Sequence, residues 1–155
     1  MSERNVVQRA FDEFGRDARF EKKSGSWYRH GQEVIAVSNL QKSQYGPRYY
    51  FNQGFWLREL GDERYPKPNK CHVQARLEGL LPAAEERINE LLDLECEMSD
   101  EQRIHELRAL LDDELLPLIE RGSTIDGLRA MLADGTLRRA GIRGPAQPVL
   151  ASAAS

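Results

Sequence analysis

The chain has 155 residues, of which 40% are hydrophobic, 8% aromatic and 30% charged, and its net charge is −3. This composition excludes a globally disordered chain, and no apolar run is long enough to cross a bilayer, so we expect no membrane partner. The first residues lack the features of a secretory signal, and two cysteines, Cys71 and Cys96, are too few for a disulfide scaffold. We therefore expect a cytoplasmic protein with reduced thiols.

The N-terminal segment carries apolar residues at helical spacing, from Val7 to Phe14. This pattern predicts an amphipathic helix over residues 3–14. Ser2 is placed to cap it, and Gly15 to end it.

Four runs rich in aromatic, branched or alternating residues follow, and turn sequences or a proline-rich loop separate them. Such runs are typical of strands in an antiparallel meander. The predicted strands cover residues 27–29, 33–42, 48–60 and 71–77.

The period of the apolar residues becomes helical from Pro82 onward. Ser99 followed by Gln102 has the spacing of a capping box, and the apolar stripe over residues 104–118 predicts a long helix after it. Pro117 should kink or shorten this helix, because proline has no N–H group.

A last short helix is predicted over residues 123–133, with Gly135 as its stop. Beyond it the composition becomes rich in glycine, proline, alanine and serine, which predicts a flexible tail over residues 142–155. The sequence thus indicates one α+β domain over residues 1–141. We expect an antiparallel sheet of about four strands, packed with an N-terminal helix and several C-terminal helices.

The charges divide unevenly along the chain. Residues 1–77 hold 14 basic and 9 acidic residues, whereas residues 78–155 hold 8 basic and 16 acidic residues. Such asymmetry can steer a partner to one face, but it also arises when a basic sheet layer packs against an acidic helical layer.

Strand alternation assigns the polar side chains to faces of the predicted sheet. If the apolar residues of the strands share a buried face, five polar residues gather on the opposite face. Amide, imidazole and guanidinium groups there could bind a ligand or a partner, although a half-exposed sheet is normally polar outside. The candidates are Gln41, Ser43, Asn52, His72 and Arg76.

The same residues lie in segments that resemble a known family. The runs NLQKS at residues 39–43 and CHVQARL at residues 71–77 are its most specific parts. Over residues 5–120 the chain is similar to the bacterial domain-of-unknown-function family numbered 4304. The resemblance implies a compact α+β domain without an established activity, and it makes these five polar residues the ones to watch.

No pattern of metal ligands or of catalytic residues is present. Cys71 and His72 are adjacent rather than spaced, and Cys96, His30 and His105 lie on other predicted elements, so we expect no metal, no cofactor and no disulfide.

Ser43 and His72 could pair as nucleophile and base, but no Gly-x-Ser-x-Gly motif surrounds the serine. We therefore assign no catalytic residue, and the sequence favours a protein without enzymatic activity.

Three functions stay open on the sequence alone. The leading hypothesis is a protein-interaction module, immunity-like in neutralising or positioning another bacterial protein, that uses the polar and aromatic sheet face. The second is an enzyme or a nucleotide- or anion-binding protein, in which Arg76 holds an anion, His72 transfers a proton, and Gln41 and Asn52 orient the substrate. The third is single-stranded nucleic-acid binding by aromatic and basic residues, among them Trp27, against which the acidic net charge argues.

Overall fold

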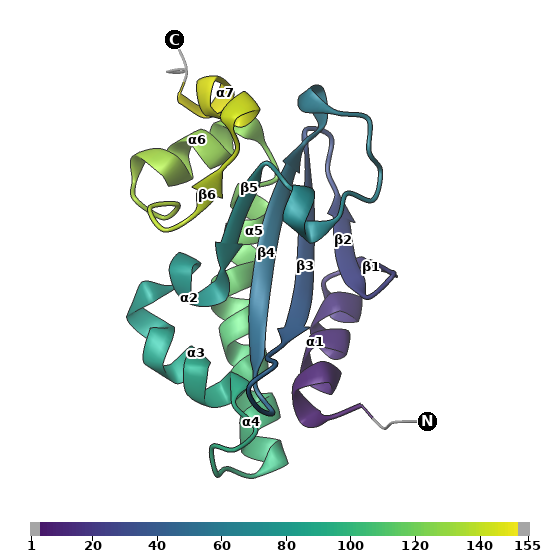
Figure 1. Cartoon of the computed structure of the whole chain (residues 1–155), viewed down its shortest axis with the longest axis vertical. Coiled ribbons are helices and arrows are strands. Elements are labelled where there is room, and N and C mark those ends of the chain that lie inside the picture. Colours follow the sequence, from purple (N-terminus) through teal and green to yellow (C-terminus); the bar gives the residue numbers. More distant parts are fainter. Residues whose placement is uncertain (1–3, 152–155) are drawn as a thin grey trace.

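The computed structural model describes residues 4–151 and confirms the α+β fold. Its six strands form one antiparallel sheet in sequence order (Figure 1). The expectation of about four strands missed two short edge strands, one at each side. The strands are β1 Glu21–Lys23, β2 Ser26–His30, β3 Val34–Lys42, β4 Tyr49–Leu57, β5 Val73–Arg76 and β6 Gly141–Ile142.

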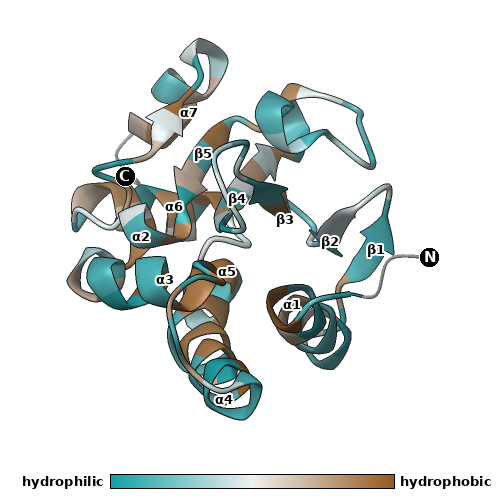
Figure 2. Cartoon of the chain, turned by 60° about the horizontal axis from the view of Figure 1, so that its bottom comes forward, coloured by the Kyte–Doolittle hydropathy of each residue, from teal (hydrophilic) through white to brown (hydrophobic). Residues whose placement is uncertain are grey.

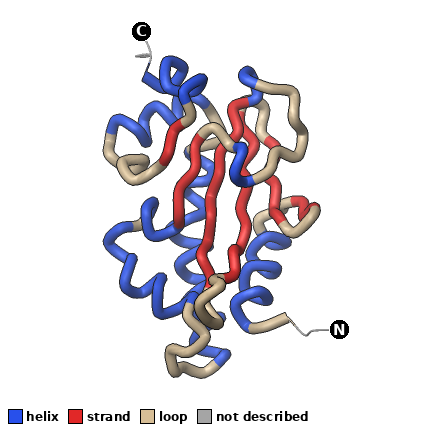
Figure 3. Tube along the Cα trace, in the orientation of Figure 1, coloured by secondary structure: helices blue, strands red, loops and turns tan. Residues whose placement is uncertain are grey.

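The helices pack mainly on one face of this sheet, while the loop between β4 and β5 passes over the other face (Figure 3). None of the helices within residues 4–151 is long and apolar enough to span a membrane. The α-helices are α1 Val6–Asp17, α2 Leu77–Leu80, α3 Glu85–Leu92, α4 Asp100–Leu110, α5 Leu116–Arg121, α6 Ile125–Ala133 and α7 Gln147–Ala151. Single 3-10 turns are η1 Arg58–Leu60, η2 Pro68–Lys70, η3 Pro82–Ala84 and η5 Gly144–Ala146.

The first helix begins and ends later than predicted. Asn5 caps it through a reciprocal pair of hydrogen bonds with Gln8, each 3.0 Å long, while the expected cap Ser2 lies outside the described residues. Gly15 does not end the helix but lies inside it against Trp27, since a β-carbon at Gly15 would stand 2.5 Å from the indole ring. The glycine therefore allows α1 to approach the sheet closely.

The long helix begins as predicted, because the Gln102 N–H donates to the Ser99 hydroxyl at 3.1 Å. Pro117 does not shorten it. Instead a π-helical turn, η4 Leu111–Leu115, joins α4 to α5, and the Leu116 N–H donates to the Leu111 carbonyl. The wider turn lies just before the proline, where the regular hydrogen-bond pattern cannot continue.

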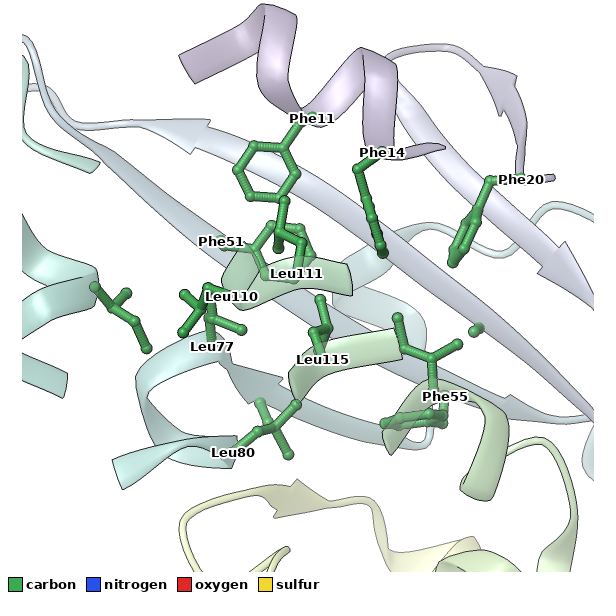
Figure 4. Close-up of a cluster of buried hydrophobic side chains, with 14 of the residues drawn as sticks. Phe11, Phe14, Phe20, Phe51, Phe55, Leu77, Leu80, Leu110, Leu111 and Leu115 are labelled. Atoms are coloured by element: carbon green, nitrogen blue, oxygen red, sulfur yellow. The ribbon is translucent and has the colours of Figure 1, made fainter. Parts of the chain in front are cut away.

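The main core lies between the sheet and the helices, as Figure 4 shows. Phe11 of α1 stacks on Phe51 of β4, with ring centroids 4.6 Å apart, and Phe14 and Phe55 are also buried. The helices turn their apolar sides inward and their polar sides outward (Figure 2). The predicted contact between the N-terminal helix and the sheet core is therefore confirmed.

The segment expected to be a flexible tail is folded through Ala151. Ile142 belongs to β6, which pairs with β5, and Ala146 and Leu150 are buried in the core. The expectation for residues 142–151 is thus corrected, because the composition concealed a few apolar residues with partners in the core. Residues 152–155 lie outside the described part of the chain.

Candidate functional site

A pocket of about 760 Å³ opens on the sheet face opposite the main helices. We call it the sheet-face pocket. Its floor comes from the central strands, and its walls come from the loop before β5 and from the segment before β6. Its lining includes Ser26, Asn39, Gln41, Asn52, Gly54, Lys67, Asn69, Gln74, Arg76 and Arg139.

A row of polar side chains crosses the floor of this pocket. Asn39 of β3 pairs in register with Asn52 of β4, and Asn52 pairs with Arg76 of β5, so the three side chains stand at one level on one face. The Asn52 amide donates to Gln41 Oε1 at 3.1 Å, and the Arg76 guanidinium lies 3.9 Å from the centre of the Tyr50 ring. Since neighbouring strands are about 4.8 Å apart, the row spans roughly 10 Å from Asn39 to Arg76.

The charge of the pocket is positive, although the chain as a whole is acidic. Lys67, Arg76 and Arg139 line it, and no carboxylate does within residues 4–151. Arg139 pairs with Glu85 at 3.2 Å, whereas Arg76 and Lys67 have no acidic partner in the described chain. An anionic group is therefore the natural complement of this site.

The Asn39 carboxamide oxygen is a second unsatisfied group in the row. It is buried and accepts no hydrogen bond from any described residue. A buried acceptor without a partner costs about 1–3 kcal/mol. The row therefore has a buried acceptor without a partner at one end and an exposed cation at the other.

The predicted candidates Gln41, Asn52 and Arg76 line this pocket together, but His72 does not. His72 is on the same face, yet its Nδ1 accepts the Leu57 N–H at 2.9 Å and its ring lies 4.3 Å from that of Trp56. Burial, and secondarily the charge of Arg143, lowers the pKa of His72. Alternation gave the correct face for this residue, but not its burial or its bond to the neighbouring strand.

Ser43 is also absent from the lining of the sheet-face pocket. It is buried in the turn after β3, where its hydroxyl accepts the Tyr45 N–H at 3.1 Å. The bond to His72 is made at Leu57, which pairs with Val34 at the other end of β3. At about 3.3 Å per strand residue the two ends lie on the order of 25 Å apart, so a direct Ser43–His72 pair is excluded.

Trp27 faces the helices instead of the pocket. It packs against Gly15 of α1, whereas its neighbours Ser26 and Tyr28 line the pocket on the other face. Trp27 therefore does not belong to the sheet-face pocket. It was chosen as a candidate because it is aromatic and not by its alternation within β2.

Several lining residues were not predicted as site residues. Asn39 and Gln74 share the alternation of Gln41 and Arg76, so the pattern itself could have identified them. Lys67 and Arg139 come from outside the strands, and no local sequence signal marks them. Only the fold brings these cations to the polar row.

A thiol fills the space beside Gly54 in the polar face. A β-carbon at Gly54 would stand 2.7 Å from Cys71 Sγ. Burial raises the pKa of Cys71 to about 12, so this thiol stays protonated near neutral pH. Cys71 and Cys96 are both free, and residues 4–151 hold no group of three or more metal-ligating side chains.

Comparison with known proteins gives one match. The family model described as "Domain of unknown function (DUF4304)" matches residues 13–121, which include the C-terminal end of α1, the first five strands and the helices through α5. No curated protein and no solved structure matches the chain. The polar row lies inside the matched region, whereas Arg139 and β6 lie beyond it.

Proposed function

We propose that this chain, which belongs to the DUF4304 family, is a binding module. In this proposal its sheet-face pocket holds an acidic segment of a partner protein. The observation that carries this proposal is the row Asn39–Asn52–Arg76. It combines an unsatisfied acceptor with an unpaired cation in a pocket without carboxylates.

The amide side chains of the pocket suit a peptide. Gln41, Asn52 and Gln74 each carry a donor and an acceptor, as does every peptide bond. Arg76 can take a carboxylate through two parallel hydrogen bonds, and its stacking on Tyr50 holds the guanidinium plane in place. A partner segment would thus place an acidic side chain at Arg76 and its peptide groups beside the amide side chains of the pocket.

The side chains best suited to catalysis are not placed for it, which favours a binding role. His72 uses its acceptor nitrogen inside the sheet, Cys71 is a protonated and buried thiol, and Ser43 is on the order of 25 Å from His72. The alternative of a nucleotide- or anion-binding protein therefore depends on Arg76 and its neighbours alone. The free thiols also fit a reducing compartment such as the cytoplasm.

An array of acidic hexapeptides tests the proposal, with the same peptides bearing Asn and Gln for Asp and Glu as the neutral set. We expect the wild-type protein to retain acidic peptides and Arg76→Ala to lose at least tenfold in affinity, as for a charged hydrogen-bonded pair. Arg138→Ala is the matched control, since it removes the same charge at an exposed residue outside the pocket lining.

Equal binding of the acidic and neutral sets, or equal losses in the two variants, would refute the proposal. Titration with inorganic phosphate, AMP and a single-stranded RNA covers the other two functions. Binding of any of these that depends on Arg76, without binding of acidic peptides, would replace the peptide by that ligand.

A further inference from the structure

A second pocket, of about 490 Å³, lies between the end of β4, the loop that leads to β5 and the segment after β6. We call it the edge pocket. Trp56 and His72 line it, and their rings are 4.3 Å apart at an angle of 38°. The indole N–H donates to the Gly61 carbonyl at 3.4 Å, and His72 is bonded to Leu57, so both rings are fixed in position.

Basic side chains surround these two rings. Lys67, Lys70 and Arg143 line the edge pocket against one carboxylate, that of Glu63. Arg143 is held in place by donating to the Asn69 carbonyl at 2.6 Å, and the two lysines have no acidic partner within residues 4–151. Trp56 and His72 expose only 8% and 6% of their surface, so the pocket joins a small aromatic contact area to an excess of positive charge.

We propose that the edge pocket binds a planar aromatic ring that carries an anionic group, either a carboxylate or a phosphate. The ring packs against Trp56 and His72, and the anion lies between the two lysines. Aromatic surface gives the ring an apolar contact area, and the lysines favour the charged form over a neutral analogue. Lys67 lines both pockets, but neither Arg76 nor Asn39 lines the edge pocket, so different variants test this proposal and the proposed function.

The chain offers a direct reporter for this binding. It has two tryptophans, and Trp27 lies on the opposite face of the sheet from Trp56. In a two-dimensional ¹⁵N–¹H spectrum the variant Trp27→Phe assigns the two indole signals. We expect 2-naphthoate to move the Trp56 signal saturably without moving the Trp27 signal, and we expect 2-naphthamide to leave both signals in place.

A second pair of compounds, AMP and adenosine, distinguishes a phosphate ligand from a carboxylate ligand. A saturable Trp56 shift with AMP but not adenosine supports a phosphate ligand, and a shift with naphthoate alone supports a carboxylate. Lys70→Gln should weaken the responding anion by about two- to fivefold, as for an exposed ion pair. Lys42→Gln is the control, because this exposed lysine does not line the edge pocket.

Three results would overturn the proposal: no saturable shift with either anion, equal shifts with the neutral analogues, or equal affinities in the two lysine variants. An unchanged spectrum outside the pocket in each variant shows that the fold is intact, so a lost response reports on the site.

Discussion

The two faces of the sheet are made from the same strands but differ in chemistry. Toward the helices, β4 presents Phe51 and Phe55 to the main core. Toward the loop side, the residues between them are Asn52 and Gly54, which line the sheet-face pocket. Side chains that alternate along one strand thus separate the packed core from the proposed binding face, because each face can change while the other keeps its contacts.

The largest effect is expected from Phe51→Ala on the helix-covered face. Phe51 is fully buried and stacks on Phe11, so its truncation should lower the free energy of unfolding by about 3–5 kcal/mol. Urea denaturation measures this change. The neighbouring Asn52→Ala on the open face should cost less than about 1 kcal/mol, and similar losses for both variants would contradict the difference between the faces.

A polar residue on the helical side should be nearly as important. Arg103 is 2% exposed and donates to the carbonyls at residues 90, 91, 93 and 96, which closes the end of α3 and the loop after it. Arg103→Met should reduce the free energy of unfolding by about 3 kcal/mol, because buried carbonyls lose their donor. The exposed Arg138→Met serves as the control, and a loss no larger than that of the control would show that the carbonyls find other partners.

His72 should make the free energy of unfolding depend on pH. Its pKa in the folded protein is lowered by burial below the usual value near 6.5, so the unfolded chain takes up a proton first as the pH falls. Its contribution to stability is complete above about pH 6.5 and is lost as the pH falls from there toward the folded-state pKa, with a slope of at most about 1.4 kcal/mol per pH unit.

Denaturation curves between pH 7.5 and 5.5 test this for wild type and His72→Gln, in which glutamine can still accept the Leu57 N–H. We expect a shallower pH dependence in the variant. The exposed His105→Gln should behave like wild type, and identical slopes for all three proteins would show that His72 is not the titrating group.

The smallest effect on stability is expected at Arg76. This exposed side chain contributes a cation–π contact with Tyr50, so Arg76→Ala should cost no more than about 1 kcal/mol by urea denaturation. A much larger loss would mean that Arg76 is a structural residue, and the open face would then no longer be separable from the core.

The sequence predicted the central strands and the long helix because their periodicity is strong. It also predicted the shared face of Gln41, Asn52 and Arg76, since alternation is a property of the strand itself. Alternation predicts the face on which a side chain lies but not how far it is buried. For this reason His72 was predicted as a surface group, although it bonds inside the sheet. Edge strand β6 escaped prediction because two residues carry no pattern, and their pairing with β5 spans a long stretch of chain.

The position of β6 near the C-terminus has a consequence for how the two pockets can vary. β6 joins the sheet through two residue pairs, and the arginines on either side of it, Arg139 and Arg143, each supply a wall of one pocket. The floors of both pockets belong to residues that the family match covers, whereas these walls lie after its last residue, 121. A substitution at Arg139 or Arg143 therefore changes the wall of one proposed binding pocket and leaves the strands that form its floor in place.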